Sequence, residues 1–447
     1  MNNRRVPHVL VICNDVVGDR MAGPAIRCWE MARSMQRHFP VKLAIPNEPG
    51  PETRTTCTVP LVTYSSENLK SLCQNHDIVV IQGWVLELHP EISSFDNVVI
   101  VDLYDPISLE CLEIDKSDPV NVSVQKNIAN VGVLNRQMLI GDYFICASER
   151  QRDYWMGALT SLLRINPQTH RSERPLIDVV PFGVSETPPS ETDEGIRVRL
   201  GIPDDALVLL WGGGIWNWFD PLTVIRAMQV MRNSAVQPYL VFMGTKHPNP
   251  AVPEMEMCQR AIQLSKELEL YGHQVFFNTG WVPYDQRQGV LLDADVGVSS
   301  HFDSWETRLA FRTRILDYLW AGLPVLSTRG DVLSDMVVEY EAGMQLPFES
   351  VDGWCDAIKQ VSDPSRRVAF SSGARALAEE LTWDKVTRPL IEFCTHAAKS
   401  EDADVDTVNH VRQTLSANET LSANEPSQTI GPFRMRFSRW IHDWIQT

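Results

Sequence analysis

The sequence lacks several patterns that would assign it to a common class of protein. Its nine cysteines include no C-x-x-C pair and no zinc-type spacing, so neither a disulfide framework nor a metal centre is expected. No window of about 18 apolar residues is present, which argues against a membrane-spanning helix. Positive charge is scarce, and the formal net charge of −17 argues against broad binding to nucleic acid. We therefore expect reduced cysteines, no metal and no nucleic-acid partner.

The N-terminal residues carry charge but are followed by no long apolar run. The run from His8 to Cys13 is too short for a signal-peptide core and is predicted to form a strand. With 447 residues, of which 44% are hydrophobic and 22% charged, the composition is typical of a globular protein with two or three domains. We expect a cytoplasmic protein.

Short runs rich in β-branched residues recur along the chain and are separated by helical patterns. Such runs, apolar on both faces, are typical of buried parallel strands. Two tandem sets of them predict an α/β fold with two Rossmann-like β/α/β domains. The predicted strands are 9–13, 41–45, 78–82, 98–102, 143–147 and 179–181 in the first half, and 207–211, 239–243, 275–278, 296–299 and 325–328 in the second.

Changes in composition predict the boundaries between the parts. The polar, proline-containing segment Ser185–Gly195 separates the two halves. We expect an N-terminal domain over 1–188, a C-terminal domain over 189–380 and a closing helix over 381–398. Residues 399–431 are polar and contain a duplicated hexapeptide, which predicts a flexible linker.

The last segment, 432–447, changes character again. Over Phe433–Ile445 the phenylalanine, tryptophan and isoleucine residues fall at helical spacing, with three arginines between them. A basic amphipathic helix of this kind can lie on an anionic membrane surface or bind a protein partner. The alternatives are that it packs onto its own protein or that it is disordered.

The loop after the strand predicted at 207–211 contains Gly212, Gly213 and Gly214 and leads to Asp220-Pro221 at a predicted helix start. Glycines allow backbone N–H groups to approach a ligand, and a helix N-terminus attracts an anion. The loop matches neither Walker A nor G-x-G-x-x-G. Anion binding is therefore one interpretation, and close packing of helix on strand is the other.

Two further loops follow predicted strands in the same half. Lys246 could reach a phosphate, or could be an ordinary solvated charge. In the next loop, the backbone around Trp281 and Val282 could meet a nucleobase, with Trp281 or Pro283 as a flat apolar wall. A turn with a buried tryptophan is the alternative.

The stretch 299–325 concentrates charge in one predicted strand–loop–helix unit, with Glu306, Arg312, Arg314 and Asp317 close together. Open α/β sheets bind ligands at the carboxyl ends of their strands. Two arginines near a helix start suit a bound diphosphate. The alternative is a helical Arg314–Asp317 ion pair, which would stabilise by roughly a few tenths of a kcal/mol.

At these residues the sequence resembles the retaining glycosyltransferases of family 4, which have the GT-B fold. That family carries Glu-x7-Glu followed by Ala-x-Gly-x-Pro-Val. Ala321–Val325 is similar to this ending, and Asp317 falls where the second glutamate sits, whereas Glu306 gives the spacing Glu-x10-Asp. The resemblance covers roughly residues 6–397 and also includes Gly23–Arg27, Ile145–Glu149 and Val179–Ser185.

The resemblance implies two Rossmann-like domains facing across a cleft, with a nucleotide-sugar donor bound by the second. By position, Asp317 would bind the ribose and Glu306 would lie near the donor sugar. Gly213 and Gly214 would line the phosphates, and Gly23 would abut the donor from the first domain. Retention of anomeric configuration is expected from the family.

One departure from the family affects the assignment of charge. The segment Ile215–Phe219 offers no cation where the family has an arginine. We expect Arg312 and Arg314 to supply this charge and to act with Glu306 as the catalytic groups, without a metal or other cofactor. On the acceptor side we expect Asp105, for which an ordinary turn residue before Pro106 is the alternative.

We therefore expect transfer of a sugar from a nucleotide-diphosphate-sugar to a glycan acceptor, such as a lipid-linked or surface-polysaccharide glycan. A lipid-linked acceptor would suit membrane contact through 433–445. Two alternatives remain open: a nucleotide-sugar isomerase or hydrolase on the same fold, and a non-catalytic scaffold partner in a glycan-assembly complex.

Overall fold

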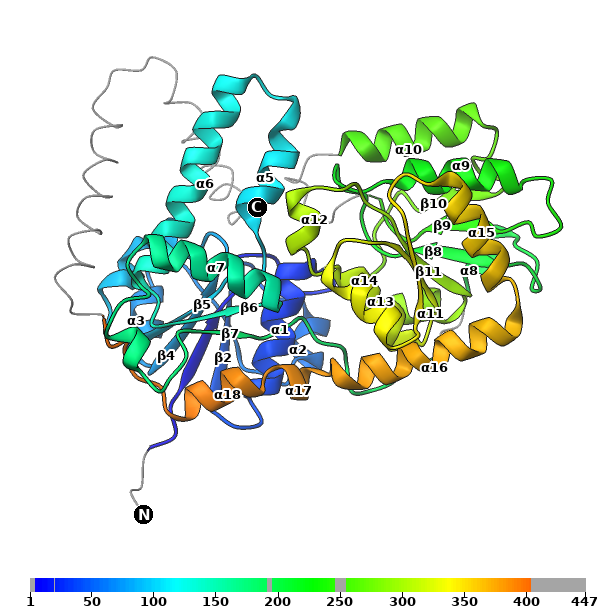
Figure 1. Cartoon of the computed structure of the whole chain (residues 1–447). Coiled ribbons are helices and arrows are strands. Elements are labelled where there is room, and N and C mark those ends of the chain that lie inside the picture. Colours follow the sequence, from blue (N-terminus) through cyan, green and yellow to red (C-terminus); the bar gives the residue numbers. More distant parts are fainter. Residues whose placement is uncertain (1–4, 20, 191–194, 246–254, 403–447) are drawn as a thin grey trace. The chain divides into compact units, whose positions relative to one another are not determined.

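The computed structural model describes residues 5–19, 21–190, 195–245 and 255–402 (Figure 1). These residues form two compact units. Of the described residues, 5–18, 23–180 and 387–402 belong to the first unit, and 19, 21–22, 181–190, 195–245 and 255–386 belong to the second. Lys246, most of the predicted linker and the segment Phe433–Ile445 lie outside the described residues. No helix within the described ranges combines the length and apolar character needed to cross a bilayer.

The first unit contains a seven-stranded, wholly parallel sheet in the order β3-β2-β1-β4-β5-β6-β7. Its inner strands are buried on both faces, as their continuous apolar runs predict. The strands are β1 Val9–Ile12, β2 Val41–Ile45, β3 Leu61–Thr63, β4 Ile78–Gln82, β5 Val98–Asp102, β6 Tyr143–Cys146 and β7 Ile177–Val179. The helices are α1 Gly23–Met35, α2 Pro51–Thr56, α3 Leu69–Gln74, α4 Val85–Leu88, α5 Ile107–Ile114, α6 Val120–Ile140, α7 Glu149–Ser161 and α18 Arg388–Thr395.

The second unit contains a six-stranded parallel sheet in the order β10-β9-β8-β11-β12-β13. Its strands are β8 Val208–Trp211, β9 Tyr239–Phe242, β10 Val275–Phe277, β11 Val296–Ser299, β12 Val325–Thr328 and β13 Gly343–Leu346. Its helices are α8 Ile196–Leu200, α9 Pro221–Met231, α10 Glu256–Glu267, α11 Arg287–Leu292, α12 Trp305–Leu309, α13 Thr313–Ala321, α14 Val332–Glu339, α15 Val351–Val361, α16 Pro364–Glu380 and α17 Trp383–Val386.

Two Rossmann-like α/β units are therefore confirmed. The sequence analysis missed two edge strands, β3 and β13, which are short and mostly only half-buried, so that neither shows a continuous apolar run. In both sheets the strand order reverses beside the first strand, at β1 and at β8. Ligands of open α/β sheets bind at such switch points, outside the carboxyl ends of the strands.

The chain leaves the first unit after Val180 and returns to it at Thr387. The predicted helix over 381–398 is two helices, α17 in the second unit and α18 in the first. The Phe393 ring of α18 stacks on Tyr143 of β6 with 3.9 Å between ring centroids. This packing fixes the returning chain to the first sheet.

Candidate active site

The glycine loop after β8 is held by a tyrosine of α13. The Gly212 N–H donates to the Tyr318 hydroxyl at 2.6 Å, and that hydroxyl lies 2.9 Å from the Val298 carbonyl oxygen. A Cβ at Gly297 would overlap the Tyr318 ring, so glycine is required there. Gly213 has φ +81°, which glycine adopts without strain. The loop is therefore fixed by the helix that carries the predicted arginine and aspartate.

Arg314 lies against this glycine loop. Its side chain is on α13, its Nη2 donates to the Gly214 carbonyl oxygen at 2.8 Å, and its guanidinium lies over Phe219 at 4.0 Å from the ring centroid. Burial lowers the pKa of Arg314 to about 10, so the side chain remains a cation at neutral pH. The residue is 9% exposed. Within the described ranges, Nη1 has no hydrogen-bond partner and no carboxylate forms an ion pair with Arg314.

Arg312 and Glu306 form a buried ion pair. The Arg312 guanidinium donates to both carboxylate oxygens of Glu306, at 2.8 and 2.7 Å. Both residues are buried, and Ser304 caps the short helix α12 that carries Glu306 by accepting from the Thr307 N–H. The Arg312 charge is therefore balanced within the protein. Of the two predicted cations, Arg314 is the one that has no carboxylate partner among the described residues.

Asp317 has a partner that the sequence analysis did not single out. The Arg287 Nε lies 3.0 Å from the Asp317 Oδ1, and the Arg287 guanidinium stacks 3.7 Å from the Tyr284 ring centroid. The helical Arg314–Asp317 pair considered from the sequence is not formed among these described residues. Arg287 begins α11, where no sequence pattern marks it as a site residue. Its position beside Asp317 follows only from the fold.

The loops after β9 and β10 lie together. The Thr245 N–H donates to the Asn278 carbonyl oxygen at 3.0 Å, and the Asn278 side chain donates to the Met243 carbonyl oxygen at 2.8 Å. A Cβ at Gly244 would lie 3.8 Å from the Trp281 ring. Trp281 and Val282 are half-buried beside this loop. The predicted base-facing residues thus belong to the same edge of the sheet as the glycine loop.

A buried histidine lies behind the acid–arginine block and was missed in the sequence analysis. The His301 Nε2 lies 3.2 Å from the Arg329 carbonyl oxygen and 3.6 Å from the Asp331 carboxylate, and Nδ1 lies 3.0 Å from the Thr328 hydroxyl. Burial lowers the pKa of His301 well below its ordinary value, so the ring is neutral. Burial also raises the pKa of Asp331, the N-cap of α14, to about 6.

Asp331→Asn is expected to stabilise the protein at pH 7.5, because it removes a buried carboxylate and keeps a residue that can cap α14. The folded pKa lies above the ordinary value of 3.8, so this carboxyl favours the fold below about pH 4, and that contribution is lost as pH rises to 6. The gain should be about 1–3 kcal/mol at pH 7.5 and should shrink toward pH 4. Urea unfolding across this range measures it.

The matched control is Asp363→Asn, which changes the fully exposed N-cap of α16. Its hydrogen bonds to Ser365 lower the pKa of Asp363, so this variant should show no gain that grows with pH. A stability difference for Asp331→Asn that is flat from pH 4 to 7.5 would contradict the assignment.

Gly23 and Asp105 belong to the first unit. Gly23 begins α1, and a Cβ there would meet nothing within 4 Å. Asp105 is half-buried in the loop after β5. Burial, and next the charge of Asp105, raise the pKa of Tyr104 well above its ordinary value. The two predicted residues thus lie beside the carboxyl ends of β1 and β5 respectively.

The sequence analysis missed a buried ion pair near these loops. Arg27 of α1 donates to the two carboxylate oxygens of Asp102 at 2.6 and 2.9 Å, and to the Val180 carbonyl oxygen at 2.8 Å. Arg27 and Asp102 are both buried. The pair ties α1 to the end of β5 and to the chain just after β7.

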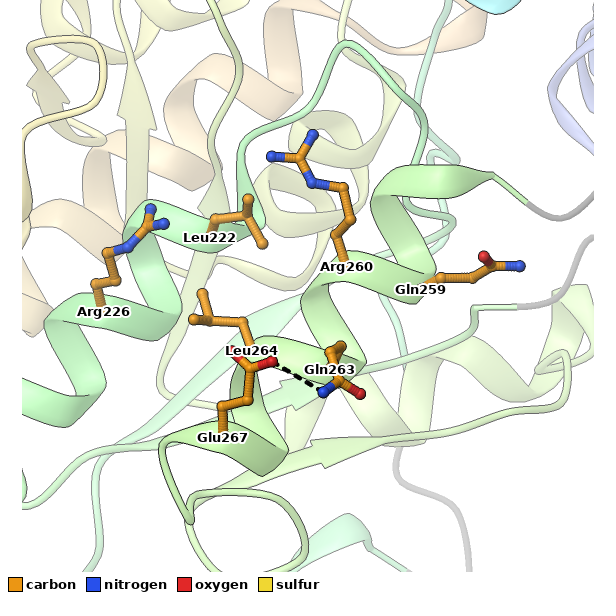
Figure 2. A pocket seen from close by; sticks show the side chains of 7 residues that line it. All are labelled: Leu222, Arg226, Gln259, Arg260, Gln263, Leu264 and Glu267. Atoms are coloured by element: carbon orange, nitrogen blue, oxygen red, sulfur yellow. Dashed lines mark hydrogen bonds between the residues drawn. The ribbon is translucent and has the colours of Figure 1, made fainter. Parts of the chain in front are cut away.

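A cavity of about 370 Å³ lies apart from these strand ends, between α9 and α10 (Figure 2). It contains none of the predicted site residues. Its lining is Leu222, Arg226, Gln259, Arg260, Gln263, Leu264 and Glu267. Within the described ranges, no group of three or more His, Cys, Asp or Glu side chains could hold a metal ion.

Comparison with solved structures identifies the fold. The HepE protein of Anabaena, solved with UDP-glucose, is 14% identical with a TM-score of 0.59 over 92% of this chain and 100% of that one. WaaG, a glycosyltransferase involved in lipopolysaccharide biosynthesis, is 14% identical with a TM-score of 0.57 over 87% of this chain and 100% of that one. The chain has the GT-B fold.

Similarity in sequence is more limited. A D-inositol 3-phosphate glycosyltransferase of Saccharomonospora viridis is 28% identical over 208 residues, which is 45% of this chain and 45% of that protein. The chain spans about half the length of the curated relatives it matches. No protein-family model matches the chain.

Proposed function

We propose that this protein is a retaining glycosyltransferase of the family 4 type, which moves a sugar from a nucleotide-diphosphate-sugar to an acceptor. One observation carries the proposal. Arg314 is a buried cation with an unused donor nitrogen beside a glycine loop, at the switch point of a GT-B sheet. A buried charge is costly unless it is paired, and a diphosphate would pair it. The names of the relatives and the UDP-glucose bound to HepE agree with this chemistry.

The second unit would hold the donor. Backbone N–H groups at Gly213 and Gly214 and the Arg314 guanidinium would bind the diphosphate, with Lys246 reaching it from the next loop. Asp317 would accept the ribose hydroxyls, and Arg287 would orient its carboxylate. Trp281 and Val282 would form the wall against the base.

In the reaction, the bond between C1 of the sugar and the diphosphate oxygen breaks, and a new bond forms from C1 to the acceptor oxygen. The leaving phosphate gains negative charge and takes the acceptor proton. Fixed donors at such a position contribute about 10²–10³ in rate each. Arg314 and the glycine-loop N–H groups supply this stabilisation, so no metal or other cofactor is needed.

Glu306 and Arg312 are assigned a positioning role beside Arg314. Because the pair is buried and both carboxylate oxygens are occupied, direct contact with the sugar would require the Arg312 hydrogen bonds to open. The pair closes the turn between α12 and α13 and so fixes the start of the helix that carries Arg314. The free-energy cost of burying the Glu306–Arg312 pair is offset by its two charge-assisted hydrogen bonds.

The acceptor would bind at the first unit, near Asp105, and Gly23 of the same unit would abut the donor. A glycan, lipid-linked or part of a surface polysaccharide, is the proposed acceptor class. We place the protein in the cytoplasm, where nucleotide sugars and reduced thiols are found.

The proposal is tested with a panel of nucleoside diphosphates and labelled nucleotide sugars. One nucleoside diphosphate should raise the melting temperature, because saturation at 100 times Kd stabilises by about 2.7 kcal/mol. The matching donor should release labelled sugar slowly to water and transfer it to an acceptor. If the sugar is isomerised or hydrolysed and is transferred to no acceptor extract, the protein is a nucleotide-sugar isomerase or hydrolase. If no nucleoside diphosphate changes the melting temperature, the protein is a non-catalytic scaffold partner.

A further inference from the structure

The helix α6 presents an apolar stripe to solvent. Its first half and α5 form a hairpin that rises from the first unit, whereas residues near its C-terminal end are buried on that unit (Figure 1). Val120 is 79% exposed and Ile128 is 61% exposed, with Val124 and Val131 also exposed. At 100° per residue these four positions fall within about 80° of the helix circumference. Four exposed β-branched residues on one stripe form a surface suited to docking.

We propose that this stripe is the docking site for the chain's own C-terminal segment, Phe433–Ile445. The two surfaces match in length. Val120 to Val131 spans about 17 Å of helix, and Phe433 to Ile445, as the helix that its pattern predicts, spans about 18 Å. The segment offers six aromatic or isoleucine residues at helical spacing, which complement the small apolar side chains of α6.

The place where the chain leaves the described structure supports this occupant. Arg164 donates to the Asp402 carboxylate at 2.8 and 3.1 Å, and the same guanidinium donates to the carbonyl oxygens of Met138 and Gly141. Met138 and Gly141 lie at the C-terminal end of α6. The described chain therefore ends at the base of the helix that carries the stripe.

The chain between residue 402 and residue 433 is long enough to reach from the end of α6 to the stripe. The stripe lies about 14–30 Å from the end of α6, measured along the helix. From their composition we expect the residues between 402 and 433 to form a flexible linker, and a flexible chain of 31 residues has a root-mean-square span of about 30 Å. Such a tether gives an effective concentration on the order of 1 mM. A segment that binds with a Kd of about 0.1 mM would then be docked in about nine molecules of ten.

The charges near the stripe favour the C-terminal segment, rather than a membrane, as its occupant. Residues 107–128 carry four acids and two lysines, a net charge of −2, whereas residues 433–445 carry three arginines and one aspartate, a net charge of +2 with His442 neutral. Membrane-binding helices carry Lys or Arg beside their apolar face. Here the flanking positions are Asn121, Gln125 and Asn127, and Lys126 bonds Asp115 and Asp118 at 2.7 and 2.6 Å.

Photo-crosslinking in the full-length protein tests the proposal. Ile128→p-benzoylphenylalanine should form an intrachain crosslink to a peptide within 433–447, identified by mass spectrometry. The double change Trp440→Ser and Trp444→Ser should lower that yield about tenfold. Val198→p-benzoylphenylalanine is the matched control, because Val198 is 81% exposed on α8 of the second unit and should give no tail crosslink.

Three results would overturn the proposal. A crosslink from Ile128 to residues 120–131 of another copy would make the stripe a dimer interface. Capture of lipid from vesicles of phosphatidylglycerol, with the tail crosslink absent, would make it a membrane surface. A tail crosslink that is equally strong at Val198, or absent at both positions, would show that the segment does not dock on α6.

Discussion

Replacing Arg314 with methionine is expected to lower turnover with the cognate donor by about 10²–10³. The buried guanidinium lies against the glycine loop, and its Nη1 has no partner among the described residues. In the proposed reaction this nitrogen meets the charge that develops on the leaving diphosphate. The loss should appear in kcat as well as in donor affinity, because the charge is greatest in the transition state.

The stability of the Arg314→Met variant distinguishes a catalytic role of Arg314 from a structural one. Methionine has a similar length and removes a buried cation that no carboxylate within the described residues balances. Replacement of a buried charge by an apolar side chain is often neutral or stabilising. Arg314→Met should therefore lose activity without a lower urea midpoint. A purely structural arginine would lose both together.

The matched control is Arg308→Met, on the neighbouring helix α12. The Arg308 side chain is mostly exposed, and its Nε lies 3.6 Å from Asp303. We expect turnover within about twofold of wild type, since exposed ion pairs contribute roughly 0–1 kcal/mol. Full activity in Arg314→Met, or an equal loss in Arg308→Met, would contradict the assignment of Arg314.

Most of the strands could be predicted from the sequence because buried parallel strands are apolar on both faces. Runs such as Ile78–Gln82 and Val325–Thr328 give a continuous signal that needs no knowledge of their neighbours. The edge strand β13, Gly-Met-Gln-Leu, has no such run, and its partner β12 supplies the pairing. Edge strands therefore depend on tertiary context that local composition does not carry.

The charged residues of the candidate site could be named from the sequence, but the ion pairs that they form could not. The acid–arginine block indicates where charge gathers, yet helical spacing favours Arg314–Asp317 as the ion pair. The structure instead joins Asp317 to Arg287, which lies 30 residues earlier. It also joins Glu306 to Arg312 across the break between α12 and α13. Spacing rules apply within one helix and fail where a turn redirects the side chains.

Asp102→Ala is expected to destabilise the first unit by about 3–5 kcal/mol, the largest stability effect that we predict. The change leaves the Arg27 guanidinium buried without its carboxylate. Arg27 is 0% exposed, so water cannot replace the two lost hydrogen bonds. Urea unfolding of the purified variant measures the loss. A cost below about 1 kcal/mol would show that the pair contributes little.

A double variant distinguishes the cost of an unpaired charge from the value of the pair. Arg27→Met with Asp102→Leu removes both charges and keeps most of the volume, so it should recover much of the lost stability. The exposed pair Arg54–Glu48, at 2.9 Å, is the control, and Glu48→Ala should cost roughly 0–1 kcal/mol. Because Asp102 ends β5 and the loop with Asp105 follows it directly, Asp102→Ala should also loosen the loop that carries the proposed acceptor residue Asp105. Acceptor affinity should then fall in Asp102→Ala by more than donor affinity. Equal losses for donor and acceptor would argue against an acceptor site on the first unit.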